Sequence, residues 1–181
     1  MSAETHAPQI PPPPLDFIGA ILSYLVPGLG QISQGRYAKG LMFLVCLYSL
    51  FFYGMYLGKF QNVYLPDYHP DEKKSSLNRL SQDIYARFQF IGQFPIGMAV
   101  WPAIYQYRVY DPNAQKVPFN GFMRAPSLEE INDLQRNSDK TFDLAWVYTV
   151  IAGVLNVLVI YDALAGPAFR EPKKASLAGG I

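Results

Sequence analysis

The sequence predicts an all-α integral membrane protein with about four apolar helices, the first short or interrupted by proline and glycine, and with short interfacial helices in the loops. Residues 41–57 contain no charged side chain, and the flanking glycines extend this run to 19 residues, close to the ~20 that a helix needs to cross hydrocarbon. Residues 88–107 and 144–161 also lack Asp, Glu, Lys and Arg. The charged residues are therefore confined to termini and loops, which is typical of a multi-pass membrane protein.

A single membrane domain is predicted for residues 15–166, between two segments that we expect to be disordered. Residues 1–14 form a proline-rich leader that ends in four consecutive prolines, a pattern that favours an extended, solvated backbone. Residues 167–181 form a small-residue, basic tail. Within the domain we expect a helical hairpin at 15–58, a third span at 88–107 and a fourth span at 142–166.

Prolines are expected to break two of these helices. The first apolar run, residues 15–26, covers only about 18 Å at 1.5 Å per residue, so Pro27 interrupts a helix that is still short. In the third span, Pro95 and Pro102 each remove a backbone donor. Their positions predict a kinked helix.

Two short helices are predicted in the loops. Residues 77–88 carry leucine, isoleucine and phenylalanine at helical spacing, which favours an interfacial helix that leads into the third span. The Ser-Leu-Glu-Glu sequence at residues 127–130 fits a capping box with Ser127 at the N-cap. We therefore expect an amphipathic helix from there through Leu134.

The composition argues against nucleic-acid binding, metal binding and catalysis. The net charge is +1 and the basic residues form no stripe with interleaved aromatics, so no nucleic-acid partner is expected. His6 and His69 have no cysteine or second histidine at zinc spacing, so we expect no metal and no cofactor. The serines show no nucleophile-elbow sequence, and the single cysteine, Cys46, is expected to pack as a small hydrophobe. The chain is therefore predicted not to be an enzyme.

The turn of the predicted hairpin, residues 27–40, carries four glycines. No strand precedes these glycines and no Gly-Lys-Ser/Thr sequence follows them, so a phosphate-binding loop is not expected. Glycine lets two helices approach closely, and the polar residues nearby supply partners for backbone groups freed by proline. The residues predicted to pack the hairpin are Pro27, Gly28, Gly30, Gln31, Gly35, Arg36 and Gly40.

The Pro-Gly-Leu-Gly-Gln sequence at residues 27–31, followed by Gly-Arg at 35–36 and Lys-Gly at 39–40, resembles the bacterial form of the two-transmembrane-helix domain, TM-two. The resemblance covers residues 17–58. Ile-Ser at 32–33 replaces the aromatic that often follows the glutamine, and the acidic-Arg-Phe triplet of eukaryotic members is absent, so no signalling role carries over. The rest of the chain resembles a longer, uncharacterised bacterial membrane family with this domain at its front. The resemblance implies the bacterial inner (cytoplasmic) membrane and no known reaction.

Polar residues in the third and fourth spans allow two interpretations. A stripe at three- and four-residue steps comprises Ala145, Thr149, Ala152, Gly153 and Asn156. We expect it to face another helix. Gln89 and Gln93 either line a polar cavity or satisfy carbonyls released by the proline that follows, and Asn156 binds either a neighbouring helix or a ligand. Asp162 is expected to be interfacial, near the end of its helix.

The leading hypothesis is a non-enzymatic membrane protein that acts as a helix-packing or interaction scaffold, because closely packing helices occur without a catalytic constellation. Its expected partners are the lipid bilayer and either further copies of itself or other membrane proteins. The alternative is a subunit of a transporter or channel that uses the polar residues of the third and fourth spans. A membrane enzyme whose polar residues converge from distant parts of the chain ranks third.

Overall fold

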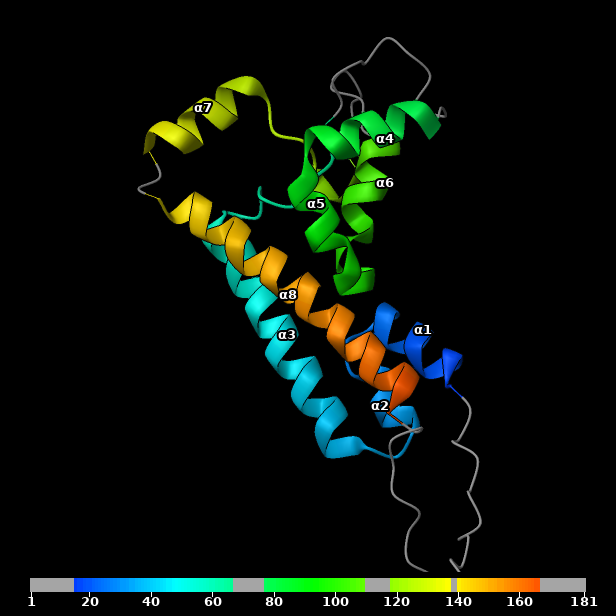
Figure 1. Cartoon of the computed structure of the whole chain (residues 1–181). Coiled ribbons are helices and arrows are strands. Elements are labelled where there is room, and N and C mark those ends of the chain that lie inside the picture. Colours follow the sequence, from blue (N-terminus) through cyan, green and yellow to red (C-terminus); the bar gives the residue numbers. More distant parts are fainter. Residues whose placement is uncertain (1–14, 67–76, 110–117, 138–139, 167–181) are drawn as a thin grey trace, which may run out of the picture.

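The described part of the chain is all-α, as predicted (Figure 1). The computed structural model describes residues 15–66, 77–109, 118–137 and 140–166. Its helices, with η marking a 3-10 helix, are α1 (Phe17–Leu25), α2 (Leu29–Ser33), α3 (Tyr37–Leu57), α4 (Leu77–Ala86), α5 (Phe88–Gln93), η1 (Phe94–Val100), α6 (Trp101–Val109), η2 (Pro118–Gly121), α7 (Leu128–Asn137) and α8 (Thr141–Ala165). The predicted leader and tail and both histidines lie outside the described residues.

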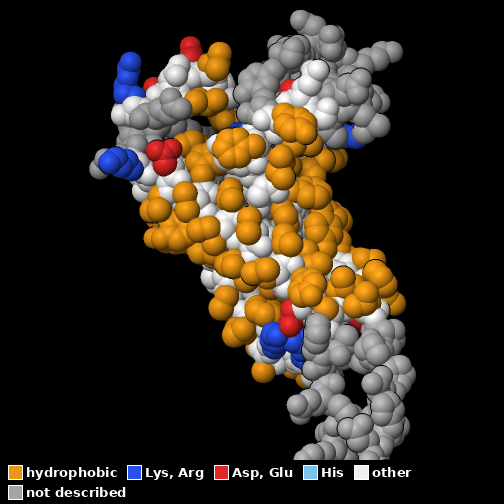
Figure 2. All heavy atoms as spheres, viewed as in Figure 1, with side chains coloured by type: hydrophobic (Ala, Val, Ile, Leu, Met, Phe, Trp, Pro, Cys, Tyr) orange, Lys and Arg blue, Asp and Glu red, His pale blue; other side chains and the backbone are white. Residues whose placement is uncertain are grey.

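Two long helices, α3 and α8, form the frame of the molecule, and both are long and apolar enough to cross a membrane. They are antiparallel, because Gly54 near the end of α3 faces Thr149 near the start of α8. Only 28% and 33% of their most apolar stretches are buried, so most of these side chains remain at least partly exposed. Figure 2 shows hydrophobic side chains over the middle of the visible face and charged side chains toward its two ends.

The small-residue stripe of α8 is buried against several different segments. Its members Ala145, Thr149, Ala152, Gly153 and Asn156 are all buried. A Cβ placed on Gly54 of α3 would lie 2.9 Å from the Thr149 side chain. A Cβ placed on Gly153 would lie 2.0 Å from the carbonyl oxygen of Gly92 in α5. The expectation that this stripe faces another helix is confirmed, and the contacts show that it faces more than one.

The helices α1 and α2 form an N-terminal half-hairpin (residues 17–33) that reaches only part of the way along α8 (Figure 1). The Asp16 carboxylate caps α1 by accepting a hydrogen bond from the Gly19 amide at 2.8 Å, and the Asp16 amide donates to the Leu164 carbonyl at 3.0 Å. The nine residues of α1 span about 14 Å. Gly28 follows with a φ of +86°, which reverses the chain. The first apolar helix is therefore short, as the proline there predicted.

Two pairs of glycines bring backbones into contact in this region. A Cβ on Gly28 would lie 2.0 Å from the Gly40 carbonyl oxygen, and a Cβ on Gly30 would lie 2.0 Å from the Gly19 carbonyl oxygen. No side chain fits there, because the obstructing atoms are backbone. Gly35 differs: it is exposed, no described atom lies within 4 Å of its would-be Cβ, and its φ is +76°. It therefore shapes the turn and does not pack the hairpin.

The predicted third span, residues 88–107, is not one helix. Its residues form α5, η1 and most of α6, and residues 88–109 fold back as a central half-hairpin (Figure 1). The reversal occurs at Gly97, whose φ of +83° and ψ of −131° belong to a region open only to glycine. A Cβ on Gly97 would lie 1.7 Å from the Tyr24 carbonyl oxygen, so the tip of this half-hairpin touches the end of α1. The break expected from the prolines is therefore a reversal of the chain and not a kink within one helix.

The predicted capping box of α7 is confirmed. The Ser127 amide donates to the Glu130 carboxylate at 2.7 Å, and the Glu130 amide donates to Ser127 Oγ at 3.2 Å. Arg124 also pairs with this carboxylate. The helix continues to Asn137, three residues beyond the predicted end. Both α7 and α4 lie toward the end of the molecule where α8 begins (Figure 1).

Acidification is expected to loosen the first turn of α7. The hydrogen bond from Arg124 holds the pKa of Glu130 below its ordinary value, although desolvation opposes this. Because the folded-state pKa is the lower one, the stabilisation is present above the ordinary carboxyl pKa and is lost as the pH falls through the folded-state pKa. Hydrogen-exchange protection factors of α7 amides should fall with acidification in the wild type and in E129Q, but much less in E130Q. An equal fall in E130Q would contradict this assignment.

Candidate functional site

Polar side chains of the described residues gather at three levels along α8. These levels are centred on Thr149, Asn156 and Asp162, which follow one another at intervals of roughly two helical turns. We refer to them as the Thr149 cluster, the Asn156 cluster and the Asp162 cluster. Each cluster joins α8 to a different part of the chain.

The Asp162 cluster joins the last turn of α8 to the segment around α2. Arg36 Nη2 lies 2.7 Å from Asp162 Oδ2, and Lys39 Nζ lies 2.6 Å from Asp162 Oδ1. Gln31 Nε2 donates to the Val159 carbonyl oxygen at 2.8 Å and to Asp162 Oδ2 at 3.1 Å. One carboxylate therefore meets two cations and an amide, and charge-assisted hydrogen bonds of this kind are the strong ones.

Gln34 and Asp16 extend this cluster to the start of α1. Gln34 Nε2 donates to Asp16 Oδ2 at 2.8 Å and to the Ala163 carbonyl oxygen at 2.6 Å. The hydrogen bond from the Gly19 amide and the one from Gln34 hold the pKa of Asp16 below its usual value. A charged carboxylate at this position also interacts favourably with the positive N-terminal end of α1.

The Asn156 cluster lies where the two half-hairpins meet. Asn156 Nδ2 donates to the Ser23 carbonyl oxygen of α1 at 3.1 Å and to the Pro95 carbonyl oxygen of η1 at 2.7 Å. Ser23 Oγ donates to Gln31 Oε1 at 3.0 Å and accepts from the Gly30 amide at 3.2 Å. One amide of α8 therefore holds both half-hairpins, and Ser23 links it to the Asp162 cluster.

The Thr149 cluster joins the loop after α3 and the end of α5 to α8. Gln93 Nε2 donates to Thr149 Oγ1 at 2.8 Å and to the Asn62 carbonyl oxygen at 3.3 Å. Asn62 Nδ2 donates to the carbonyl oxygens of Ala145 at 3.1 Å and Gly54 at 3.3 Å. Because the Asn62, Gln93 and Thr149 side chains are fully buried, these bonds replace contacts that water would otherwise make.

Three amide oxygens in these clusters have no hydrogen-bond partner among the described residues. They are Asn62 Oδ1, Gln93 Oε1 and Asn156 Oδ1. Each amide nitrogen donates to a backbone carbonyl oxygen, which only accepts, so the orientation of the amide group is fixed. The free oxygens are therefore buried acceptors, suited chemically to a proton donor or a cation.

A family model described as a family of unknown function, DUF6677, matches residues 18–176. The chain belongs to DUF6677. No curated protein and no solved structure matches it. The DUF6677 match extends well beyond residues 17–58, the part that resembles the TM-two domain. It contains the central half-hairpin and every residue of the three clusters except Asp16.

The DUF6677 chain also buries a cation between two aromatic rings. Arg87 Cζ lies 3.2 Å from the ring centroid of Tyr64 and 3.8 Å from that of Trp146. Arg87 is 6% exposed, and neither terminal nitrogen has a hydrogen-bond partner among the described residues. Burial lowers the pKa of this guanidinium, and the two ring faces oppose that effect because they stabilise the cation. This stack fastens the residues before α5 to α8.

The structure distributes the predicted site residues unevenly. Gln31 and Arg36 meet Asp162, whereas Gln93 and Asn156 lie in the other two clusters. Pro27, Gly28, Gly30 and Gly40 are buried in the N-terminal half-hairpin and its junction with α3. Gln89 is only partly buried and lies outside the three clusters.

Several residues that organise DUF6677 contacts were not anticipated from the sequence. Ser23 is a single small polar residue within an apolar run. Small polar residues in such runs often lie in helix–helix interfaces, so this position was a usable signal. Gly97 follows Pro95 by two residues, and this Pro-x-Gly sequence was a turn signal. Asn62 and Arg87 lie in connecting segments where no local periodicity indicates which helix they contact.

Removing the charge of Asp162 is expected to destabilise the DUF6677 chain. Asp162→Asn leaves Arg36, whose side chain is 15% exposed, without its carboxylate. We expect the free energy of unfolding in mixed micelles to fall by about 2 kcal/mol, less than for a fully buried pair because the site is partly solvated. Lys39→Met removes the cation that is 40% exposed and should cost less than about 1 kcal/mol. Equal costs for both variants would contradict this ranking.

Proposed function

We propose that this chain is an integral membrane protein in which α3 and α8 cross the bilayer and the two half-hairpins enter it from opposite sides. At 21 and 25 residues, α3 and α8 span about 31 and 37 Å, enough for a hydrocarbon core of about 30 Å. Their outward side chains support this placement, because Val45, Val154 and Leu158 are each about half exposed or more. The resemblance of residues 17–58 to the bacterial TM-two domain supports the bacterial inner membrane.

Within that membrane, we propose that the protein is a non-enzymatic scaffold that offers the outer faces of α3 and α8 to other membrane proteins or to further copies of itself. One observation carries this proposal: the amide donors of Asn156, Gln31 and Gln34 are all engaged by backbone carbonyls of other segments. Polar residues used in this way fasten helices together. They support a rigid body that presents apolar surface.

Site-specific photo-crosslinking in native membranes tests this scaffold. A photoreactive side chain is placed at Val45 of α3, at Val154 of α8, and at Glu129 of α7 as an exposed control. We expect protein adducts of discrete mass from at least one of the two long helices and not from Glu129, and mass spectrometry then identifies the partner. Exclusively lipid adducts along the outer faces of both long helices would contradict the scaffold.

A second candidate, a transporter or channel subunit, is favoured by one specific observation. Two half-length hairpins meet at Asn156, whose Oδ1 is buried without a partner, and broken helices that meet near the bilayer centre form substrate sites in many transporters. Proteoliposomes would be assayed with a panel of monovalent cations and small solutes. Flux of at least one solute through the wild type supports this candidate, and no flux with any solute counts against it.

A further inference from the structure

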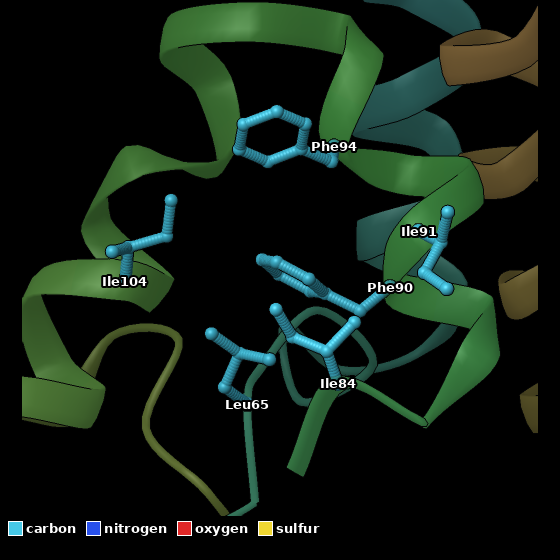
Figure 3. Close-up of a pocket in the computed structure, with 6 residues that line it drawn as sticks. All are labelled: Leu65, Ile84, Phe90, Ile91, Phe94 and Ile104. Carbon is cyan, nitrogen blue, oxygen red and sulfur yellow. The ribbon is translucent and has the colours of Figure 1, made fainter. Parts of the chain in front are cut away.

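An apolar cavity of about 330 Å³ lies inside the central half-hairpin (Figure 3). Its lining comes from the segment before α4, from α4 itself and from both legs of the half-hairpin, and comprises Leu65, Ile84, Phe90, Ile91, Phe94 and Ile104. Figure 3 shows Phe94 at one end of the space, with Leu65 and Ile84 at the other. The exposed surface of this lining is entirely apolar.

Contacts with α8 place one end of the cavity at the middle of that helix. A Cβ on Gly92 would lie 2.7 Å from Val150, and a Cβ on Gly153 would lie 2.0 Å from the Gly92 carbonyl oxygen. Val150 and Gly153 lie near the centre of the 25-residue α8. Phe90 and Phe94, two residues on either side of Gly92, are therefore at that depth. If α8 crosses the bilayer, the cavity reaches hydrocarbon.

The cavity is open to the apolar surface of the molecule. Two of its lining residues, Ile91 and Phe94, are themselves 50% and 41% exposed. Water is not stable in such a space, because a buried water molecule needs two to four polar hydrogen-bond partners. If the space is empty, the side chains that line it lose dispersion contacts on that side. Hydrocarbon is the available filling, since the lining is apolar and two of its residues belong to the exposed apolar surface of the molecule.

We propose that one acyl chain of a bilayer phospholipid occupies this cavity. The proposal rests on the membrane placement proposed above. A flexible chain fits the site better than a partner helix, because a 10 Å length of helix about 10 Å across fills roughly 800 Å³. A polar ligand is disfavoured, because the lining offers no group that fixes its orientation. The bound chain completes the packing between the legs of the half-hairpin.

Photolabelling with a phosphatidylcholine that carries a diazirine in the middle of one acyl chain tests this site. The purified full chain is reconstituted in nanodiscs containing this lipid, and labelled residues are mapped by mass spectrometry. Ile104→Trp fills the cavity, Ile104→Val preserves it, and Ile151→Trp adds the same bulk on the outer face of α8, where Ile151 is 42% exposed. Size-exclusion profiles check that each variant is folded.

We expect labels on the cavity residues of the wild type, a several-fold loss of those labels in I104W, and unchanged labelling in I104V and I151W. Labels on the outer face of α8 without labels in the wild-type cavity would overturn the acyl-chain site while leaving the membrane placement intact. Equal cavity labelling in folded I104W would also overturn the acyl-chain site. If I104W fails to fold, the presence or absence of labels on the cavity residues of the wild type decides whether the site exists. No label on either surface would overturn the membrane placement and the site together.

Discussion

Gly97→Ala is expected to lower the free energy of unfolding by about 4 kcal/mol or more, enough to abolish the folded yield of most small domains. The added Cβ would lie 1.7 Å from the Tyr24 carbonyl oxygen, and alanine also resists a φ of +83°. The obstructing atom belongs to the backbone of α1, so it cannot turn away. Unfolding in mixed micelles and size-exclusion yield measure the effect.

Gly35→Ala separates backbone strain from steric exclusion. Gly35 has a similar φ of +76°, but no described atom obstructs its would-be Cβ. Alanine there should cost only about 1 kcal/mol. If the two variants are equally stable, the contact between the central half-hairpin and α1 does not exist in the folded protein.

Asn156→Leu is expected to cost about 2 to 4 kcal/mol, because it removes the donor shared by a buried carbonyl oxygen at Ser23 and a partly buried one at Pro95. Leucine has the same branched shape and the same number of side-chain heavy atoms, so no cavity forms and the hydrogen bonds to Ser23 and Pro95 are lost. Hydrogen exchange should accelerate in residues 17–33 and 88–100, since both half-hairpins lose the same tether. The amides of α3 should change much less.

Val157→Ala is the control for Asn156→Leu, because this neighbour is 47% exposed on α8. Its truncation should change stability by less than about 1 kcal/mol. A similar exchange pattern in both variants, or unaltered stability in Asn156→Leu, would show that Asn156 does not hold the half-hairpins.

The features that sequence reasoning anticipated are those with local causes. Charge-free runs of sufficient length identified α3 and α8, and the Ser127 and Glu130 pattern identified the start of α7. The small residues of α8 indicated a packed face because their helical spacing alone places them together. In each case, all the residues that form the pattern lie within a few helical turns of one another in the sequence.

The features that it missed depend on contacts between distant segments. Pro95 and Gly97 are compatible with either a kinked helix or a reversal of the chain. The reversal places Gly97 against the Tyr24 carbonyl oxygen, a contact with a distant segment that the local sequence does not indicate. Asn62 hydrogen-bonds Ala145, which lies 83 residues away. A single sequence records the residue types at both ends of such a contact but not their pairing.

The Asn156 and Asp162 clusters have a consequence for the order of biosynthesis. Gln31 and Val159 are separated by 128 residues, and Ser23 and Asn156 by 133. At about 5–20 residues per second, the ribosome synthesises the N-terminal half-hairpin roughly 6 to 27 seconds before the residues that hold it. Until then the Ser23 carbonyl oxygen and the Gln31 amide nitrogen lack their partners on α8, so the contacts of this early-made segment are completed late. A nascent chain stopped before α8 is therefore an incomplete product, exposed to chaperones and proteases.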